Sequence, residues 1–134
     1  MRLSLALLLA VPAPLLAQAQ PDTLPIEVAK RQIETFNRHD LDGFMALYAD
    51  DASIAEFPSG KVLTVGKAAI RERYAPVFKG ATVPTVRVDP RVVDGVFVVD
   101  QERWEGRPGQ RNTAVWMYEI RGGLIRKAWT VRFP

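Results

Sequence analysis

The sequence predicts an α+β fold in which a strongly curved, mainly antiparallel sheet wraps around three N-terminal helices. Two observations lead to this prediction. Apolar residues recur at helical spacing through the first half of the chain, and alternating strand patterns joined by tight turns fill the second half. A curved sheet closed by helices forms a cone with one apolar-walled internal pocket, which is the usual place for a small ligand.

The segment from Met1 to Ala19 is typical of a secretory signal peptide. Arg2 gives a positive start, a leucine- and alanine-rich run follows to Leu16, and Ala17-Gln18-Ala19 is a small-x-small cleavage site. The apolar run is shorter than the ~20 residues that span a bilayer, and two prolines interrupt it. We therefore expect residues 1–19 to be removed, a periplasmic or secreted protein, and no stable membrane anchor.

The remaining chain has the length of one domain, which we place at residues 25–134 after a flexible lead at 20–24. The absence of cysteine excludes disulfides, thiolate catalysis and zinc–sulfur sites. With a single histidine, a transition-metal site would need carboxylates alone, so we expect neither a metal nor another cofactor. The net charge of +3 arises from interspersed charges of both signs, which favours a solvated surface over nucleic-acid binding.

Three helices are predicted in the first half. The first covers residues 25–38 and begins at Pro25, and the second covers 41–48 behind the capping residue Asp40. Residues 52–57 then form an extended segment, which a turn connects to a short strand at 61–65. The third helix covers 66–78, and we expect Pro76 to kink its last turn before Gly80 ends it.

Four long antiparallel strands are predicted in the second half. Alternation marks the first strand from about Val86, and Asp94-Gly95 is a strong signal for a two-residue hairpin turn into the strand at 96–104. Two more strands follow at 112–121 and 124–133, joined by a second tight turn at Gly122-Gly123.

The Gly122-Gly123 turn predicts a register for the last hairpin. Arg121 pairs with Leu124, and unbroken pairing then brings Trp116 opposite Trp129. One face of the hairpin would carry Trp116, Tyr118, Lys127 and Trp129, and the other Thr113, Val115, Met117, Ala128, Thr130 and Arg132. The spacing leaves open which of the two faces lies inside.

Residues 36–78 (FNRHDLDGFMALYADDASIAEFPSGKVLTVGKAAIRERYAPVF) resemble the opening of the nuclear transport factor 2-like superfamily, in its SnoaL-like branch. The resemblance rests on Asp40, the YADDA segment at 48–52 and the GKAAI segment at 66–70, and the hairpin at 118–125 resembles the family's closing strands. It extends over residues 25–133 and implies a cystatin-like cone. The superfamily contains isomerases, dehydratases, cyclases, hydrolases and non-catalytic binding modules.

Within this superfamily, the nearest catalytic comparison is ketosteroid isomerase. Superposing the YADDA segments implies that the general base corresponds to Glu56 and the pocket tyrosine to Tyr74. The same comparison makes the face with Thr113 and Met117 the inner one, and adds Val98, Asp100, Glu102 and Trp104 from the preceding strand. The two oxyanion-hole donors of the isomerase correspond to Gln32 and Thr113, which are weak donors. Steroid isomerisation by the known constellation is therefore not expected.

From these residues we expect the cone to bind a small, largely apolar molecule. If the protein is an enzyme, Glu56 would act as general base, with Tyr74 and Gln32 as hydrogen-bonding helpers; a non-catalytic ligand-binding or interaction module is the alternative. The predicted inner carboxylates Glu56, Asp100 and Glu102 would face Arg132. Either at least one of them has a raised pKa and serves catalysis or ligand contact, or Arg132 forms a structural ion pair with Asp100 or Glu102. The expected ligand-binding residues are Gln32, Phe36, Tyr48, Asp100, Glu102, Trp104, Thr113, Met117 and Arg132.

Sheet-face homodimers are common in this superfamily. With the inner face assigned as above, Trp116 and Trp129 would form an apolar patch on the outer surface of the sheet. We therefore predict a homodimer through this patch.

Overall fold

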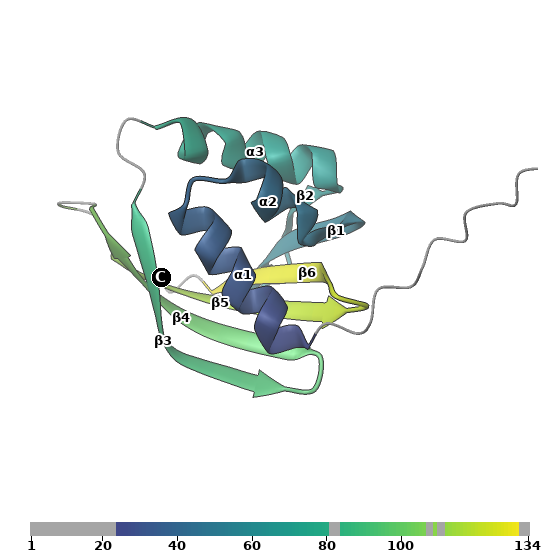
Figure 1. Cartoon of the computed structure of the whole chain (residues 1–134). Coiled ribbons are helices and arrows are strands. Elements are labelled where there is room, and N and C mark those ends of the chain that lie inside the picture. Colours follow the sequence, from purple (N-terminus) through teal and green to yellow (C-terminus); the bar gives the residue numbers. More distant parts are fainter. Residues whose placement is uncertain (1–23, 81–83, 107–108, 110–111, 132–134) are drawn as a thin grey trace, which may run out of the picture.

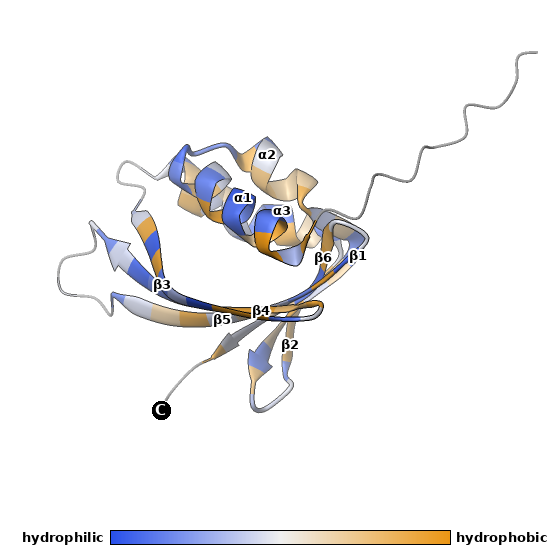
Figure 2. Ribbon diagram, turned by 60° about the horizontal axis from the view of Figure 1, so that its bottom comes forward, coloured by the Kyte–Doolittle hydropathy of each residue, from blue (hydrophilic) through white to orange (hydrophobic). Residues whose placement is uncertain are grey.

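In the computed structural model, the described residues are 24–80, 84–106, 109 and 112–131. They form one curved six-stranded sheet with three helices on one side of it (Figures 1 and 2). The expected signal peptide at 1–19 and the predicted ligand-binding residue Arg132 lie outside the described residues. Within the described ranges, no helix is both long and apolar enough to cross a membrane.

The α+β prediction is confirmed, and the elements follow in the predicted order. They are α1 (Pro25–Asn37), α2 (Leu41–Ala46), β1 (Tyr48–Phe57), β2 (Val62–Val65), α3 (Lys67–Lys79), β3 (Thr85–Asp94), β4 (Phe97–Glu105), β5 (Thr113–Arg121) and β6 (Leu124–Val131). Helix α1 packs against β3, β4 and β5, whereas α3 packs against β1 and β2.

Helix α2 begins with a side-chain cap. Asp40 Oδ1 accepts a hydrogen bond from the Gly43 amide at 2.8 Å. A Cβ atom on residue 43 would come within 2.3 Å of Asp40 Oδ2, so a larger residue at this position would force the capping carboxylate to shift. The predicted extension of this helix to Tyr48 is wrong. The Leu47 carbonyl accepts from the Ile125 amide at 2.8 Å, and Tyr48 begins β1 opposite Ile125.

The strand order is β2-β1-β6-β5-β4-β3, and all pairs are antiparallel except β1 with β6. The four long antiparallel strands are therefore confirmed. Their first tight turn lies one residue later than predicted, because Asp94 pairs with Phe97 and leaves Gly95 and Val96 as the loop. Gly95 has φ +54°, a conformation that favours glycine at the first loop position.

The register of the last hairpin changes within the hairpin. Arg121 pairs with Leu124 and Ile120 with Ile125, as predicted, but Glu119 pairs with Lys127. Arg126 is thus an extra residue in β6, a β-bulge, and beyond it every pair is shifted by one. Trp116 consequently lies opposite Thr130, not opposite Trp129.

This shift corrects the predicted inner face of β5. Tyr118 and Ile120 are buried on the inner side, which places Trp116 there too, while Thr113 and Met117 lie on the outer side. Ala128 and Thr130 are buried as predicted. The bulge changes which residues of β5 lie opposite them, but it leaves these two residues on the inner face of β6. The hydrophobic core lies between this inner face and the helices.

Replacing the α2 cap tests how far this short helix depends on it. We expect Asp40→Ala to lower the free energy of unfolding by about 1 kcal/mol, because the Gly43 amide loses its acceptor. Asp40→Asn keeps an acceptor and is the control. Chemical denaturation of the three proteins checks this, and equal stabilities for the alanine and asparagine variants would contradict the cap.

Candidate functional site

The candidate site lies on the inner face of β4, where two carboxylates are buried. Asp100 and Glu102 alternate with exposed or half-buried residues and have exposed fractions of 0% and 3%. The predicted inner side of this strand, with Val98 and Trp104 at its ends, is therefore confirmed. Buried carboxylates need partners or protons, and the two residues differ in which they have.

Asp100 has an ion-pair partner in Arg91. Arg91 Nε and Nη2 donate to Asp100 Oδ1 and Oδ2, each at 2.7 Å, and Nη2 also reaches the Ala29 carbonyl at 3.3 Å. Arg91 arrives at this face because the pairing of β3 with β4 is irregular between Val88 and Arg91. Asp100 therefore takes part in a structural ion pair with Arg91, whereas Arg132, the partner that the sequence suggested, lies outside the described residues.

Glu102 has no ion pair of its own among the described residues. Burial, and then the negative charge of Asp100, raise the pKa of Glu102 to about 8, while hydrogen bonding with Trp104 and Tyr118 acts in the opposite direction. The Tyr118 hydroxyl donates to Glu102 Oε1 at 3.5 Å. At neutral pH, Glu102 is therefore mostly a protonated acid, next to an aspartate that is paired with Arg91.

A second set of polar side chains consists of Gln32 from α1, Tyr74 from α3 and Tyr48 from β1. Burial raises the pKa of Tyr48 well above its ordinary value; hydrogen bonding with Gln32 lowers it again and hydrogen bonding with Tyr74 raises it. Gln32 Oε1 and Glu102 Oε2 are both buried and accept no well-formed hydrogen bond within the described part of the chain.

Gln32, Tyr74 and Glu102 are among the residues that line a cavity of about 50 Å³. Of its lining residues, the sequence predicted Gln32, Phe36, Tyr74, Glu102 and Trp104. It missed Ile33, Val86, Trp116 and Tyr118. The alternation of the closing hairpin does show Trp116 and Tyr118 on one face, but the bulge at Arg126 that turns this face inward leaves no clear trace in the sequence.

Other predicted site residues lie elsewhere. Thr113 and Met117 lie on the outer side of β5 and do not reach the cavity. Glu56, predicted as general base, pairs with Thr130 on the inner side of the sheet but is half-buried and is not among the lining residues. Tyr48 is buried and is not among the lining residues; its ring contacts Phe44 at a centroid distance of 5.3 Å.

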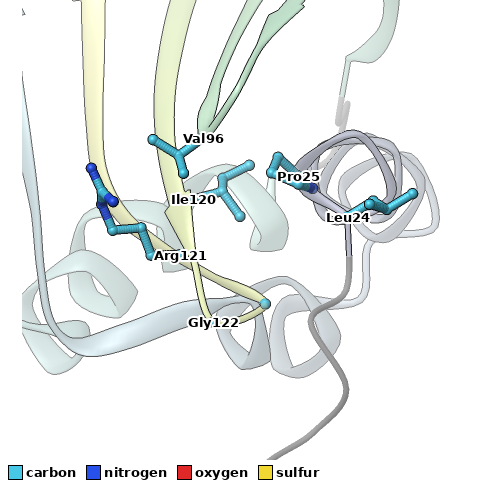
Figure 3. A pocket seen from close by; sticks show the side chains of 7 residues that line it. Leu24, Pro25, Val96, Ile120, Arg121 and Gly122 are labelled. Atoms are coloured by element: carbon cyan, nitrogen blue, oxygen red, sulfur yellow. The ribbon is translucent and has the colours of Figure 1, made fainter.

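A larger groove, of about 270 Å³, lies at the other end of α1 (Figure 3). It is bordered by Leu24 and Pro25, by Val96 of the β3–β4 turn, and by Ile120 and Arg121 next to the β5–β6 turn. Its one charged side chain, Arg121, already pairs with Glu119 at 2.6 Å. Its lining contains no carboxylate, whereas the smaller cavity is lined by the buried acid Glu102.

Comparisons with known proteins agree with this architecture. Residues 29–128 match the model of the SnoaL-like domain family. An uncharacterized cystatin fold protein from Novosphingobium aromaticivorans is 23% identical, with a TM-score of 0.68 over 81% of this chain and 97% of that chain. RV0760c from Mycobacterium tuberculosis, solved in complex with estradiol-17beta-hemisuccinate, is 19% identical, with a TM-score of 0.63 over 79% and 91% of the two chains.

An NTF-2 like protein of unknown function from Burkholderia xenovorans is also similar. It is 17% identical, with a TM-score of 0.65 over 82% of this chain and 85% of that chain. At such identities the likeness concerns the fold, and the predicted cystatin-like cone is confirmed.

The buried acid makes stability depend on pH. The raised pKa means that the folded protein keeps a proton on Glu102 between about pH 4.5 and 8, where the unfolded chain loses it. Unfolding therefore becomes easier as pH rises through this window. We expect wild type to lose on the order of 3–5 kcal/mol relative to Glu102→Gln between about pH 5 and pH 9. Denaturation curves of both proteins measure this difference, and parallel pH profiles would contradict the buried acid.

Proposed function

Because the chain belongs to the SnoaL-like domain family, we propose that its cone holds a small-molecule site in which Glu102 exchanges a proton with a polar group of the ligand. The observation that carries the proposal is the position of Glu102, a buried acid that lines the cavity and has no ion-pair partner among the described residues. An acid whose pKa lies near 8 is able to give and recover a proton close to neutral pH.

The surrounding residues divide the work. Arg91 binds both carboxylate oxygens of Asp100, whereas burial and the nearby Asp100 raise the pKa of Glu102, so Glu102 is the group that holds the proton. Gln32 and Tyr74 line the cavity opposite Glu102 and offer polar groups to a ligand, as the sequence-based hypothesis held. In this proposal Glu102 takes the role of general acid and base that the sequence assigned to Glu56.

The size of the cavity limits the ligand. About 50 Å³ is well below the roughly 300–1,000 Å³ of sites that enclose drug-sized molecules. A ligand such as the steroid ester bound by RV0760c would have to displace aromatic side chains, among them Trp104 and Phe36, whose ring centroids are 5.4 Å apart. We therefore propose a small ligand, or a larger one that inserts only one end.

The small cavity also favours a second candidate function. Phe36, Phe44 and Phe78 pack with ring centroids 5.2–6.2 Å apart and close the helical side of the cone. A domain closed in this way fits a non-catalytic binding or interaction module. We further propose export through residues 1–19, as their composition indicates.

The ligand site is tested by a thermal-shift screen of small cyclic ketones, alcohols and carboxylic acids. We expect compounds that raise the melting temperature of wild type to lose most of this effect in Glu102→Gln and to keep it in Glu56→Gln, because only Glu102 lines the cavity. If both variants respond as wild type does, Glu102 has no part in binding. If Glu56→Gln alone loses the response, the general base is the residue that the sequence suggested.

For the outer face of the sheet we propose contact with a second copy of this chain. One cross-strand row on this face is apolar on all six strands: Val62, Ala55, Trp129, Met117, Val99 and Val92. Phe57 and Phe97, also on this face, are 47% and 40% exposed. An apolar row across a whole sheet is the kind of surface that partners cover. Trp129 belongs to it, and Trp116 does not.

The two tryptophans make a matched pair for testing the dimer. We expect Trp129→Ala to raise the dissociation constant of the dimer at least tenfold, since an aromatic anchor typically contributes ~2 kcal/mol to an interface. Trp116→Ala, on the inner side, should leave the dimer unchanged. Sedimentation velocity measures both, and a monomeric wild type or an effect of Trp116→Ala alone would overturn the proposal.

A further inference from the structure

The cavity beside Glu102 presents acceptors and aromatic rings to its contents. Gln32 and Glu102, 5% and 3% exposed, each line it and each carry a buried side-chain oxygen that accepts no well-formed hydrogen bond from the described residues. The Trp104 indole also lines the cavity and is the neighbouring donor that interacts with Glu102. Five of the nine lining residues are aromatic: Phe36, Tyr74, Trp104, Trp116 and Tyr118. Acceptor oxygens are satisfied by donors, and the faces of aromatic rings attract cations.

The charges around the cavity also fit a cation. Two carboxylates, Asp100 and Glu102, share one guanidinium, that of Arg91, which binds both oxygens of Asp100. The titratable neighbours of Glu102 on the other packed elements are Tyr48, Tyr74 and Tyr118, whose pKa values are all raised by burial, so they stay neutral. With Glu102 ionised, the cluster therefore carries one uncompensated negative charge.

We propose that this cavity takes a primary ammonium group of the ligand, held by the Glu102 carboxylate and Gln32 Oε1 among the surrounding aromatic rings. The inference rests on the small-molecule site proposed above and names its ligand class. A primary ammonium has three N–H donors, enough for both buried acceptors, and carries the single positive charge that the cluster lacks. A metal ion such as Ca²⁺ would need six or more oxygen ligands, and a quaternary ammonium has no N–H donor.

Binding then moves a proton. Without ligand, Glu102 is mostly protonated at neutral pH because its pKa is about 8. When R–NH₃⁺ enters, the Glu102 O–H bond breaks, the proton goes to solvent, and the carboxylate pairs with the ammonium. Below about pH 8, the affinity for an amine should therefore rise with pH, because each binding event requires the loss of one proton.

The experiment compares butylamine with butanol by isothermal titration calorimetry of the mature protein, in phosphate and in MOPS buffer. The two ligands have nearly the same size, and the two buffers differ in protonation enthalpy, which reveals protons released on binding. We expect butylamine to bind at least tenfold more tightly than butanol at about pH 7.5, and its affinity to rise about tenfold per pH unit between about pH 6 and 7.5. Close to one proton should be released per amine at about pH 6.5.

Two variants separate the contributions. Glu102→Gln should lose the preference for the amine and the pH dependence, because an amide cannot ionise. Trp116→Leu should weaken butylamine more than butanol, since it removes an aromatic face. Asp50→Asn is the matched control: Asp50 is an exposed carboxylate on β1, and its loss should leave amine binding unchanged.

The outcomes distinguish this inference from the proposal on which it rests. If butanol binds as tightly as butylamine, or the amine binds without proton release, the ammonium site is overturned while the small-molecule site stands. If other compounds show a Glu102-dependent response in the thermal-shift screen and butylamine does not bind, the same conclusion follows. If no compound of any class depends on Glu102, both proposals fail. Proton release is measured on wild type, so the result does not depend on the folding of a variant.

Discussion

The β-bulge at Arg126 is the constraint on which the interior of this molecule depends. Residues in a strand alternate between two faces, so one extra residue in β6 reverses the relation between β5 and β6 beyond it. Tyr118 and Trp116 thereby lie inside with Ala128 and Thr130, and Met117 lies outside with Trp129. Both the lining of the cavity and the apolar row on the outer face follow from this single insertion.

The irregularity in β3 has a comparable effect on the charges. It brings Arg91 opposite Asp100, and the bidentate pair neutralises the deeper of the two carboxylates. Glu102, two residues farther along β4, is also buried but does not form an ion pair with Arg91. The two acidic side chains therefore differ in their surroundings: Asp100 has a fixed cationic partner, whereas Glu102 has a raised pKa and lies next to the cavity.

The two faces of the sheet are thus specialised in different ways. On the inner face, buried polar groups are arranged around a small aromatic cavity, and two of their oxygens accept no well-formed hydrogen bond from the described residues. On the outer face, apolar side chains continue across all six strands without a charged residue in that row. The bulge at Arg126 thus places Trp116 on the inner face and Met117 beside Trp129 in the apolar row of the outer face.

The sequence by itself determined the element order, the capping of α2 by Asp40, the Gly122-Gly123 turn and the inner side of β4, because helical spacing, caps and alternation are local properties. It also pointed to Gln32, Phe36, Tyr74, Glu102 and Trp104, all of which line the cavity. Only the tertiary structure decided that Arg91 pairs with Asp100, that Trp116 is inside and Met117 outside, and that Glu102 lies nearer the cavity than Glu56. Those outcomes depend on the register between strands. A single unpaired residue changes the face on which every following side chain lies relative to the partner strand, and a local sequence pattern does not reveal such a residue.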